Sequence, residues 1–409
     1  MPHDRLSKLL TASVSDLAAA GRAKGAESVV SAVVPARDGR GPRFLLEGEG
    51  DREFLRMNSN SYLGLCLKDE MVEAEERAVR HMGTGPGAVR FISGTWKAHV
   101  DLERRLAAFH GREAAMIFSS AYATVMGTLP ALIGEATCVI SDALNHNCII
   151  NAIRLGRPAR KQVYAHLDLG QLEGHLKAER GLSKRVIVVT DGIFSMRGDH
   201  APLDEIMALA ENYDADFPEN VVVVVDDSHG VGAFGASGRG TEEFCKSPPV
   251  DVLIGTLGKA FGVNGGYVTG KASLTGFLRE TSPFYIYSNP ITPGEAAAAV
   301  KALDIVDSPA GKKLIAHLRK MTALFERGLG ELGLETIAGE HPVVPLMVRD
   351  TGRTSALVKH LRASGILATG LNFPVVPKGD EEIRFQISAD HTEGDIVEAL
   401  EVLGRFAKG

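Results

Sequence analysis

Short apolar runs separated by amphipathic stretches organise the middle of this 409-residue chain. Residues 221–225 are five consecutive valines, which predict a strand covered on both faces within a parallel sheet. Similar runs recur between about residues 70 and 290, each followed by residues at helical spacing. This alternation predicts the α/β class, a mostly parallel sheet wrapped by helices. The other runs are residues 115–118, 138–140, 185–190 and 252–254.

The two ends of the chain follow other patterns. Residues 5–23 have apolar side chains at helical spacing, and residues 44–55 predict a β-hairpin with a glycine turn. After a long helical stretch from about Gly294, strands at 343–348 and 383–387 flank a helix at 354–364. A final helix begins after Thr392, an N-cap residue with Asp395 three positions on. We therefore expect an N-terminal helix and hairpin arm (1–59), a large α/β domain (60–293) and a small α+β domain (294–409).

Composition narrows the class of protein. A hydrophobic fraction of 44%, a charged fraction of 23% and 45 glycines are typical of a globular α/β enzyme. The net charge of -6 argues against nucleic acid as a partner. The four cysteines show no metal-ligand or disulfide spacing, so no metal is expected. No segment has the length and apolarity of a signal peptide or a membrane span, which predicts a cytoplasmic protein without a membrane partner.

Candidate chemistry follows the strand ends. Asp226 and His229 come directly after the valine run, and Lys259 follows the next apolar run. His146 follows the run at 138–140. Because the carboxyl ends of parallel strands form the ligand-binding edge of such sheets, these side chains are expected to meet there. An amine, an acid for a ring nitrogen and a histidine suit pyridoxal phosphate (PLP) best.

Other features fit the same cofactor less specifically. Residues 119–122 precede a helical stretch, whose first backbone N–H groups suit a phosphate, although small residues are also common helix caps. Arg384 lies on a strand whose apolar side chains are Ile383, Phe385 and Ile387. It therefore points to the opposite face, either as a carboxylate clamp or as a solvated charge.

Three other functions compete with PLP chemistry as explanations of these residues. Gly230, Gly232 and Gly235 match the G-x-G-x-x-G pattern of an NAD oxidoreductase, but no acid follows the next strand and no good helix start follows the glycines. The P-loop pattern fails at Leu253 and Ala260. A metal hydrolase built from Asp226, Asp227, His229 and His146 would leave Lys259 without a role.

Several motifs in one order resemble the α-oxoamine synthases, a family of fold-type I PLP enzymes. The resemblance runs from about Asn60 to the C-terminus, and it implies a fold-type I PLP transferase fold. Within the family, Val89–Ile92 and the segments 191–196, 287–289 and 373–379 look most like glycine C-acetyltransferase. The family motifs lie at residues 60–64, 90–95, 141–146, 191–196, 226–229 and 255–262.

The resemblance also implies a role for each candidate residue. Lys259 would hold the cofactor covalently, Asp226 would pair with the pyridine nitrogen, His229 would contact the phenolic oxygen and His146 would stack on the ring. Ser195 is expected beside the ring, and Ala121, Tyr122 and Thr256 at the phosphate. Ser288 and Asn289 would reach the phosphate of a neighbouring subunit in a homodimer whose active sites are shared. Asn60 and Arg384 would bind the amino acid carboxylate.

The expected activity is an acyl-CoA:amino acid C-acyltransferase that joins glycine, or a small relative, to a short acyl-CoA. With acetyl-CoA the products are 2-amino-3-oxobutyrate and CoA. The alternative is a decarboxylating synthase that uses L-alanine, L-serine or glycine with another acyl-CoA. Three departures from the acetyltransferase pattern bear on this choice: a loop from Lys259 to Tyr267 that is one residue shorter, Arg197 in place of an acid, and Ala121–Thr124 in place of the usual sequence.

Overall fold

The computed structural model describes residues 3–20, 22–23, 25–373 and 375–408. Pro374, which belongs to the segment 373–379 that resembles glycine C-acetyltransferase, lies outside the described residues. The helices are α1 (Asp4–Ala19), η1 (Leu65–Leu67), α2 (Asp69–Met82), α3 (Arg90–Ser93), α4 (Lys97–Phe109), α5 (Ala121–Leu132), α6 (Asn147–Gly156), α7 (Leu169–Glu179), α8 (Leu203–Asp214), α9 (Thr241–Cys245), α10 (Ala272–Thr281), α11 (Pro283–Ile286), α12 (Pro293–Val306), α13 (Pro309–Glu331), α14 (Thr351–Ala363) and α15 (Glu393–Lys408). The strands are β1 (Val30–Val34), β2 (Arg43–Leu46), β3 (Glu53–Arg56), β4 (Ala114–Phe118), β5 (Thr137–Asp142), β6 (Arg160–Tyr164), β7 (Arg185–Asp191), β8 (Val221–Asp226), β9 (Val252–Thr256), β10 (Gly266–Gly270), β11 (Val343–Met347), β12 (Ile366–Leu367), β13 (Thr369–Leu371) and β14 (Glu382–Gln386).

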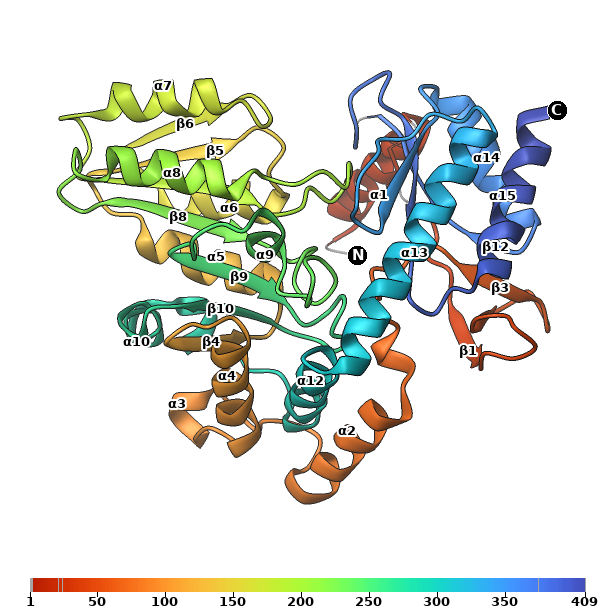
Figure 1. The fold of residues 1–409 in the computed structure, drawn as a ribbon, viewed down its shortest axis with the longest axis horizontal. Coiled ribbons are helices and arrows are strands. Elements are labelled where there is room, and N and C mark those ends of the chain that lie inside the picture. Colours follow the sequence, from red (N-terminus) through yellow and green to blue (C-terminus); the bar gives the residue numbers. More distant parts are fainter. Residues whose placement is uncertain (1–2, 21, 24, 374, 409) are drawn as a thin grey trace.

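A seven-stranded, mostly parallel sheet forms the centre of the molecule (Figure 1), in the order β4-β10-β9-β8-β7-β5-β6. The valine run forms β8, which pairs in parallel with β7 and β9. Of its residues only Val222 is not fully buried. The prediction of a central strand covered on both faces is therefore confirmed.

Helices cover both faces of this sheet. Val186, Val188, Val221, Val223 and Val225 pack into one apolar cluster with side chains of α7 and α8. Their alternating neighbours on the same strands pack into a second cluster with side chains of α5, α6 and α10. A strand has period two, so the continuous apolar runs supply both layers at once.

The strand β10 was not predicted from the sequence. It is antiparallel to both of its neighbours, β4 and β9. Its five residues begin with Gly266 and end with Gly270, and glycine is unfavourable in strands. The two apolar residues between them, Tyr267 and Val268, are too few to predict a strand. The sheet is for this reason mostly, not entirely, parallel.

Two smaller sheets lie beside the large sheet in Figure 1, one from the C-terminal part and one mostly from the N-terminal strands β1, β2 and β3. One is antiparallel, in the order β11-β14-β13. The other joins the predicted hairpin, now β2 and β3, to β12 through a parallel pairing of β3 with β12. A buried ion pair of 2.6 Å between Arg43 and Asp395 ties the same hairpin to the start of α15.

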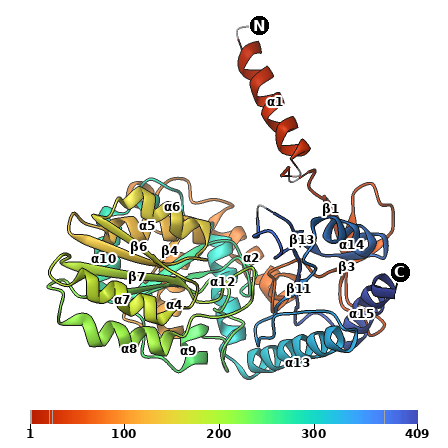
Figure 2. The same cartoon turned by 90° about the horizontal axis from the view of Figure 1, so that it is seen from above.

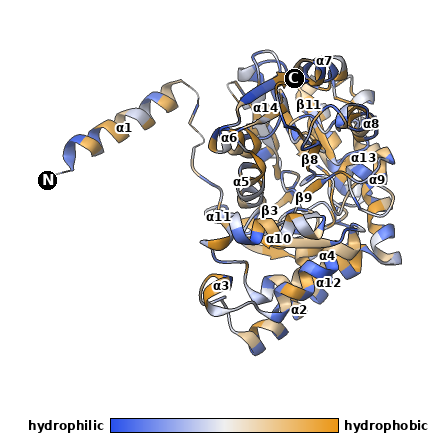
Figure 3. Ribbon diagram, turned by 90° about the vertical axis from the view of Figure 1, so that its left-hand side faces the viewer, coloured by the Kyte–Doolittle hydropathy of each residue, from blue (hydrophilic) through white to orange (hydrophobic). Residues whose placement is uncertain are grey.

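Helix α1 projects from the rest of the molecule (Figure 2), and none of its residues is buried. The hydropathy colours of Figure 3 show apolar and polar residues mixed along it. The apolar residues include Leu6, Leu10 and Val14, which are 57%, 58% and 62% exposed. The neighbouring edge strand β1 is also almost wholly exposed. Across the described residues, no helix combines the length and the apolar character that crossing a bilayer requires.

Candidate active site

Asp226 lies at the carboxyl end of β8, where the valine strand reaches the edge of the sheet. Its side chain is buried, and one carboxylate oxygen accepts hydrogen bonds from the backbone N–H and the hydroxyl of Ser228, at 3.1 and 2.5 Å. The other oxygen has the Cys148 thiol at 3.7 Å. A buried carboxylate needs a cation or strong donors, so the second oxygen is suited to a cationic group of a ligand.

A second acid, Asp191, ends the adjacent strand β7 and is paired in register with Asp226. Burial and the nearby charge of Asp226 hold the pKa of Asp191 well above its ordinary value. One of its oxygens accepts a hydrogen bond of 2.8 Å from the backbone N–H of His146. Asp191 was recognised in the sequence only as part of a motif, because its contact with Asp226 depends on the strand register.

His146 caps the N-terminus of α6, just beyond β5. Its Nδ1 lies 2.9 Å from the Cys148 sulfur. Burial lowers the pKa of His146 and raises that of the Cys148 thiol, so the imidazole is neutral and the cysteine protonated. A flat, neutral ring at the strand edge is suited to stacking on an aromatic ligand.

Lys259 follows the end of β9 and lies within electrostatic range of Asp226 and Asp191. Burial lowers its pKa from 10.5 to about 8, while the charges of Asp226 and Asp191 oppose that shift. A larger fraction of the amine is therefore neutral near physiological pH than for an exposed lysine. A desolvated amine with a lowered pKa is the state in which a lysine can attack a carbonyl group.

His229 is held by two groups, Tyr62, which the sequence indicated only as part of the motif at residues 60–64, and His341, which it did not indicate. Its Nδ1 lies 2.7 Å from the Tyr62 hydroxyl, and its backbone carbonyl accepts a 3.0 Å hydrogen bond from Nε2 of His341. Burial, then the charge of Lys259, places the pKa of His229 well below its ordinary value. The Tyr62 hydroxyl also donates to Oδ1 of Asn60 at 3.3 Å. Tyr62 and His341 come from segments almost 280 residues apart, so no local motif could connect them.

Arg384 projects from β14 of the small antiparallel sheet toward the same edge. It donates a 3.0 Å hydrogen bond to the backbone carbonyl of Ser195, and its guanidinium lies 2.7 Å from the Gln386 amide. Gln386 in turn contacts Asn60. The side chains of Arg384 and Gln386 share one strand face, as the alternation with Ile383 and Phe385 predicted.

The start of α5 approaches the sheet closely. Ser120 is the N-cap, and its side chain accepts a hydrogen bond from the backbone N–H of Ala123 at 3.1 Å. The N–H groups of Ala121 and Tyr122 are the first two of the helix, which have no partner within it and can bind an anion. A Cβ on Gly266 would lie 2.4 Å from the backbone N of Ala121, so only glycine allows β10 to run here.

Thr256 ends β9 and stabilises the turn that leads to Lys259. Its hydroxyl accepts from the backbone N–H of Gly258 at 3.1 Å and donates to the Gly265 carbonyl at 3.2 Å. Ser288 and Asn289 lie elsewhere, on the loop between α11 and α12. Within the described part of the chain, neither forms a hydrogen bond with the residues around Lys259.

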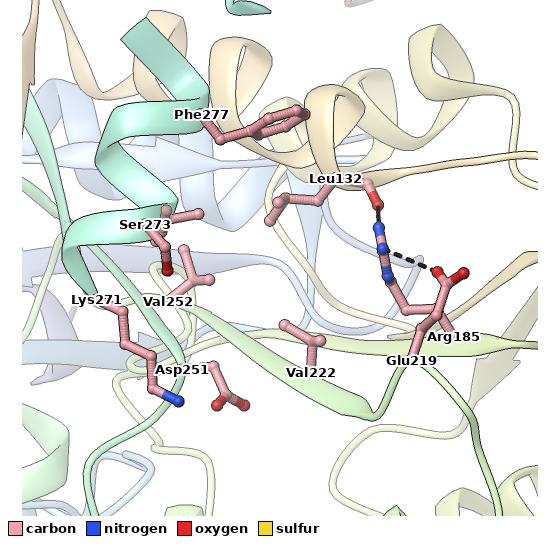
Figure 4. A pocket seen from close by; sticks show the side chains of 10 residues that line it. Leu132, Arg185, Glu219, Val222, Asp251, Val252, Lys271, Ser273 and Phe277 are labelled. Atoms are coloured by element: carbon pink, nitrogen blue, oxygen red, sulfur yellow. Dashed lines mark hydrogen bonds and ion pairs between the residues drawn. The ribbon is translucent and has the colours of Figure 1, made fainter.

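A cavity of about 650 Å³ opens beside Lys259. It is lined by polar side chains of the segment 56–61 and by the loop 258–264. A different cavity of about 360 Å³ lies where β7, β8 and β9 begin, at the opposite edge of the sheet (Figure 4). In that cavity Arg185 forms an ion pair of 2.9 Å with Glu219, so its charge is not available to a ligand. The cavity beside Lys259 is therefore the better candidate site.

The glycine pattern at residues 230–235 has a structural role. These residues form turns after β8, and the next helix is the short α9, so no helix follows the pattern directly. A Cβ on Gly192, Gly230 or Gly240 would lie within 2.3 Å of the Asp227 carboxylate, which also accepts two hydrogen bonds from Thr241. Within the pattern, Gly230 makes room for this carboxylate, whereas Gly232 and Gly235 lie against Ala260 and Glu243. The glycines of the pattern therefore serve close packing, and the arrangement does not support an NAD oxidoreductase.

Comparisons with known proteins agree with this arrangement. The family described as "Aminotransferase class I and II" matches residues 52–403. The 8-amino-7-oxononanoate synthase of Geobacter sulfurreducens is 40% identical over 370 residues, covering 90% of this chain and 92% of the relative. The 8-amino-7-oxononanoate synthase 1 of Bacillus subtilis is 38% identical, covering 87% and 89%.

Solved structures show the same fold. The serine palmitoyltransferase of Sphingomonas wittichii has a TM-score of 0.85 at 24% identity and covers 99% of this chain and 98% of its own. The 8-amino-7-oxononanoate synthase of Francisella tularensis has a TM-score of 0.73 at 21% identity. The relatives named here do not support the glycine C-acetyltransferase prediction; they favour the alternative synthase.

The donor set fits PLP: a lysine with a lowered pKa, an acid for the ring nitrogen, a flat histidine, and a helix N-terminus for the phosphate. The chain belongs to the class I and II aminotransferase family, and within it to the α-oxoamine synthases, acyl-transferring enzymes of fold-type I that use PLP.

Proposed function

We propose that this enzyme condenses L-alanine with a seven-carbon acyl-CoA that ends in a carboxylate, pimeloyl-CoA, to give 8-amino-7-oxononanoate. The observation that carries the proposal is the 40% identity to a synthase of that name over 92% of its length. The product's carbon skeleton identifies both substrates. Its carbons 8 and 9 are the α-carbon and methyl group of alanine, and carbons 1 to 7 are the acyl group.

The bonds balance with these two substrates. The α C–H bond of alanine breaks and its proton is taken up by Lys259. A bond then forms between the α-carbon and the thioester carbonyl carbon, and the C–S bond breaks to release CoA. The bond to the alanine carboxyl group also breaks, releasing carbon dioxide, and a proton replaces it at the α-carbon. When bound, PLP supplies the electron sink that stabilises negative charge at this carbon.

Each candidate residue has a proposed task. Asp226 keeps a positive charge on the ring nitrogen, and His146 supports the ring face. Lys259 takes the α-proton of the amino acid, for which a pKa of about 8 is well suited. The fork of Arg384, with Asn60, binds the amino acid carboxylate. These tasks place proton transfer on Lys259 and substrate orientation on Arg384.

The remaining predicted residues have proposed tasks at the cofactor. His229 contacts the phenolic oxygen, and the protonated Tyr62 hydroxyl fixes the orientation of its ring. Ser195 lies beside the ring. The backbone of Ala121 and Tyr122, together with Thr256, receives the phosphate. Together they hold the cofactor from its ring to its phosphate.

We also propose a homodimer. Ser288 and Asn289 lie outside the Lys259 cluster of their own chain, as expected for residues that complete the phosphate site of a second copy. The exposed apolar side of α1 is the second feature that a neighbouring copy would cover. The exposed region continues from α1 into β1, which is an edge strand of one of the smaller sheets.

A substrate matrix tests the proposed reaction. The purified enzyme is assayed with L-alanine, L-serine and glycine against acetyl-, pimeloyl- and palmitoyl-CoA, and both CoA thiol and carbon dioxide are measured. We expect L-alanine with pimeloyl-CoA to be the fastest pair and to release the two products in equal amounts. Release of CoA from glycine and acetyl-CoA without carbon dioxide would restore the acetyltransferase reading. Lys259→Ala serves as the inactive control.

A further inference from the structure

We infer that Arg56 binds an anionic group of the acyl-CoA substrate, and that this group is the carboxylate at the far end of the acyl chain. The inference rests on the proposed function. Arg56 is the last residue of β3 and lines the same cavity as Lys259 and Asn60. No sequence motif pointed to it.

Arg56 differs from the other arginines of its hairpin region. Arg37, Arg43 and Arg52 form ion pairs with Glu53, Asp395 and Glu49, respectively. Arg56 has no acidic partner within 4.0 Å among the residues that the structure describes, and its guanidinium donates no hydrogen bond to them. A cation without a partner in a cavity wall is available to a ligand anion.

Its position is nevertheless well defined. The guanidinium carbon lies 4.9 Å from the centre of the buried Phe44 ring, and the backbone carbonyl accepts a 3.1 Å hydrogen bond from Nε2 of His391. Stacking on an aromatic ring covers one face of the guanidinium and leaves its N–H edge free. That edge can bind a carboxylate through two parallel hydrogen bonds.

The surroundings explain why a cation is required here. Two acids line the same cavity, Glu75 and Glu295, although one oxygen of Glu295 accepts a hydrogen bond from the backbone N–H of Thr292. The adjoining small hollow, which Arg56 also lines, contains Asp390. An acyl chain ending in a carboxylate would be repelled by these acids, and burying it without a partner is costly. Arg56 is the cavity-lining residue with a permanent positive charge that can offset both effects.

Two sources of negative charge share this chemistry, the acyl carboxylate and the phosphates of CoA. Kinetics of Arg56→Gln and Arg56→Lys with pimeloyl-CoA and with heptanoyl-CoA, the acyl-CoA of equal length without the carboxylate, separate them. For Arg56→Gln we expect an increase of about 10- to 100-fold in KM for pimeloyl-CoA, the usual effect of losing a hydrogen bond to a charged group. We expect kcat, and the KM for heptanoyl-CoA, to stay unchanged. Arg56→Lys should recover part of the loss.

The control and the binding measurement keep this test independent of the reaction. Arg52→Gln removes an arginine of the same hairpin that does not line the cavity, so its kinetics should match the wild type. Calorimetric titration of the holoenzyme with pimeloyl-CoA should show the same affinity loss for Arg56→Gln.

Each outcome has a defined meaning. An equal loss with both acyl-CoAs would assign Arg56 to the CoA phosphates and overturn the carboxylate assignment. Unchanged kinetics and affinity would overturn the inference while the proposed reaction stands. If the wild type condenses neither acyl-CoA with any amino acid, the proposed function fails, and the titration alone then decides whether Arg56 binds the anion.

Discussion

Lys259 shows how burial changes a single residue. Its amine lies within electrostatic range of two acids, yet desolvation outweighs their attraction and brings its pKa from 10.5 down to about 8. Asp191, beside Asp226, shows the opposite change, because burial and a like charge favour the protonated acid. The same desolvation therefore lowers the pKa of the lysine and raises the pKa of one of two adjacent acids.

This shift predicts a pH-dependent stability of the cofactor-free protein. Between about pH 8 and pH 10.5 the unfolded chain keeps a proton on Lys259 that the folded chain has lost, so the contribution of Lys259 to the free energy of unfolding rises with pH. Below about pH 8 the buried charge is least favourable. Denaturant unfolding of the wild type and of Lys259→Met should show the variant more stable near neutral pH. That advantage should shrink as the pH approaches 10.5, and a difference independent of pH would contradict the prediction.

At the scale of elements, the site depends on how closely strands and helices approach each other. Strand β10 passes the first turn of α5 so closely that a Cβ on Gly266 would lie 2.4 Å from the Ala121 N and 2.5 Å from its Cα. Both atoms are backbone and cannot rotate away. The position of the helix N-terminus is thus determined by a strand that was not predicted.

Gly266→Ala should separate β10 from α5 and weaken PLP binding. Overpacking of this kind typically costs about 1–3 kcal/mol. Spectroscopic titration with PLP and thermal unfolding should show a weaker affinity and a lower Tm. Gly276→Ala, in α10 with no atom within 4 Å of the new Cβ, is the matched control and should leave both unchanged or raise the Tm slightly. Equal behaviour of the two variants would show that the close approach is unimportant.

Strands with uninterrupted apolar runs were predictable, and the glycine-flanked strand β10 was not. The valine run gave β8 correctly, and Asp226, His146 and Lys259 were expected at its edge because parallel strands end together. The contact of Tyr62 with His229 and the importance of His341 and Arg56 were not predicted, because they depend on contacts with distant segments or on the lack of one. Periodicity reports which face of an element is buried, but not what that face meets.

At the scale of the whole molecule, the exposed N-terminal region is the surface that the proposed dimer would cover. If a second copy covers α1, replacing Leu6, Leu10 and Val14 by serine should shift the protein toward monomer, as measured by light scattering during size-exclusion chromatography. Replacing Ser7, Thr11 and Ser15, on an adjacent side of the helix, by alanine should not. A dimer unaffected by the serine variant would assign the interface to other surfaces.

The pairing of β3 with β12 joins residues early in the chain to residues more than 300 positions later. During synthesis from the N-terminus, the hairpin at 43–56 emerges long before β12 and before Asp395, the buried partner of Arg43. The strands of the large sheet, which lie between residues 114 and 270, have all been made by then. The edge of β3 that pairs with β12 therefore stays unpaired until translation is nearly finished. We therefore expect the smaller sheet, in which Arg56 is the last residue of β3, to be completed late in the synthesis and folding of the enzyme.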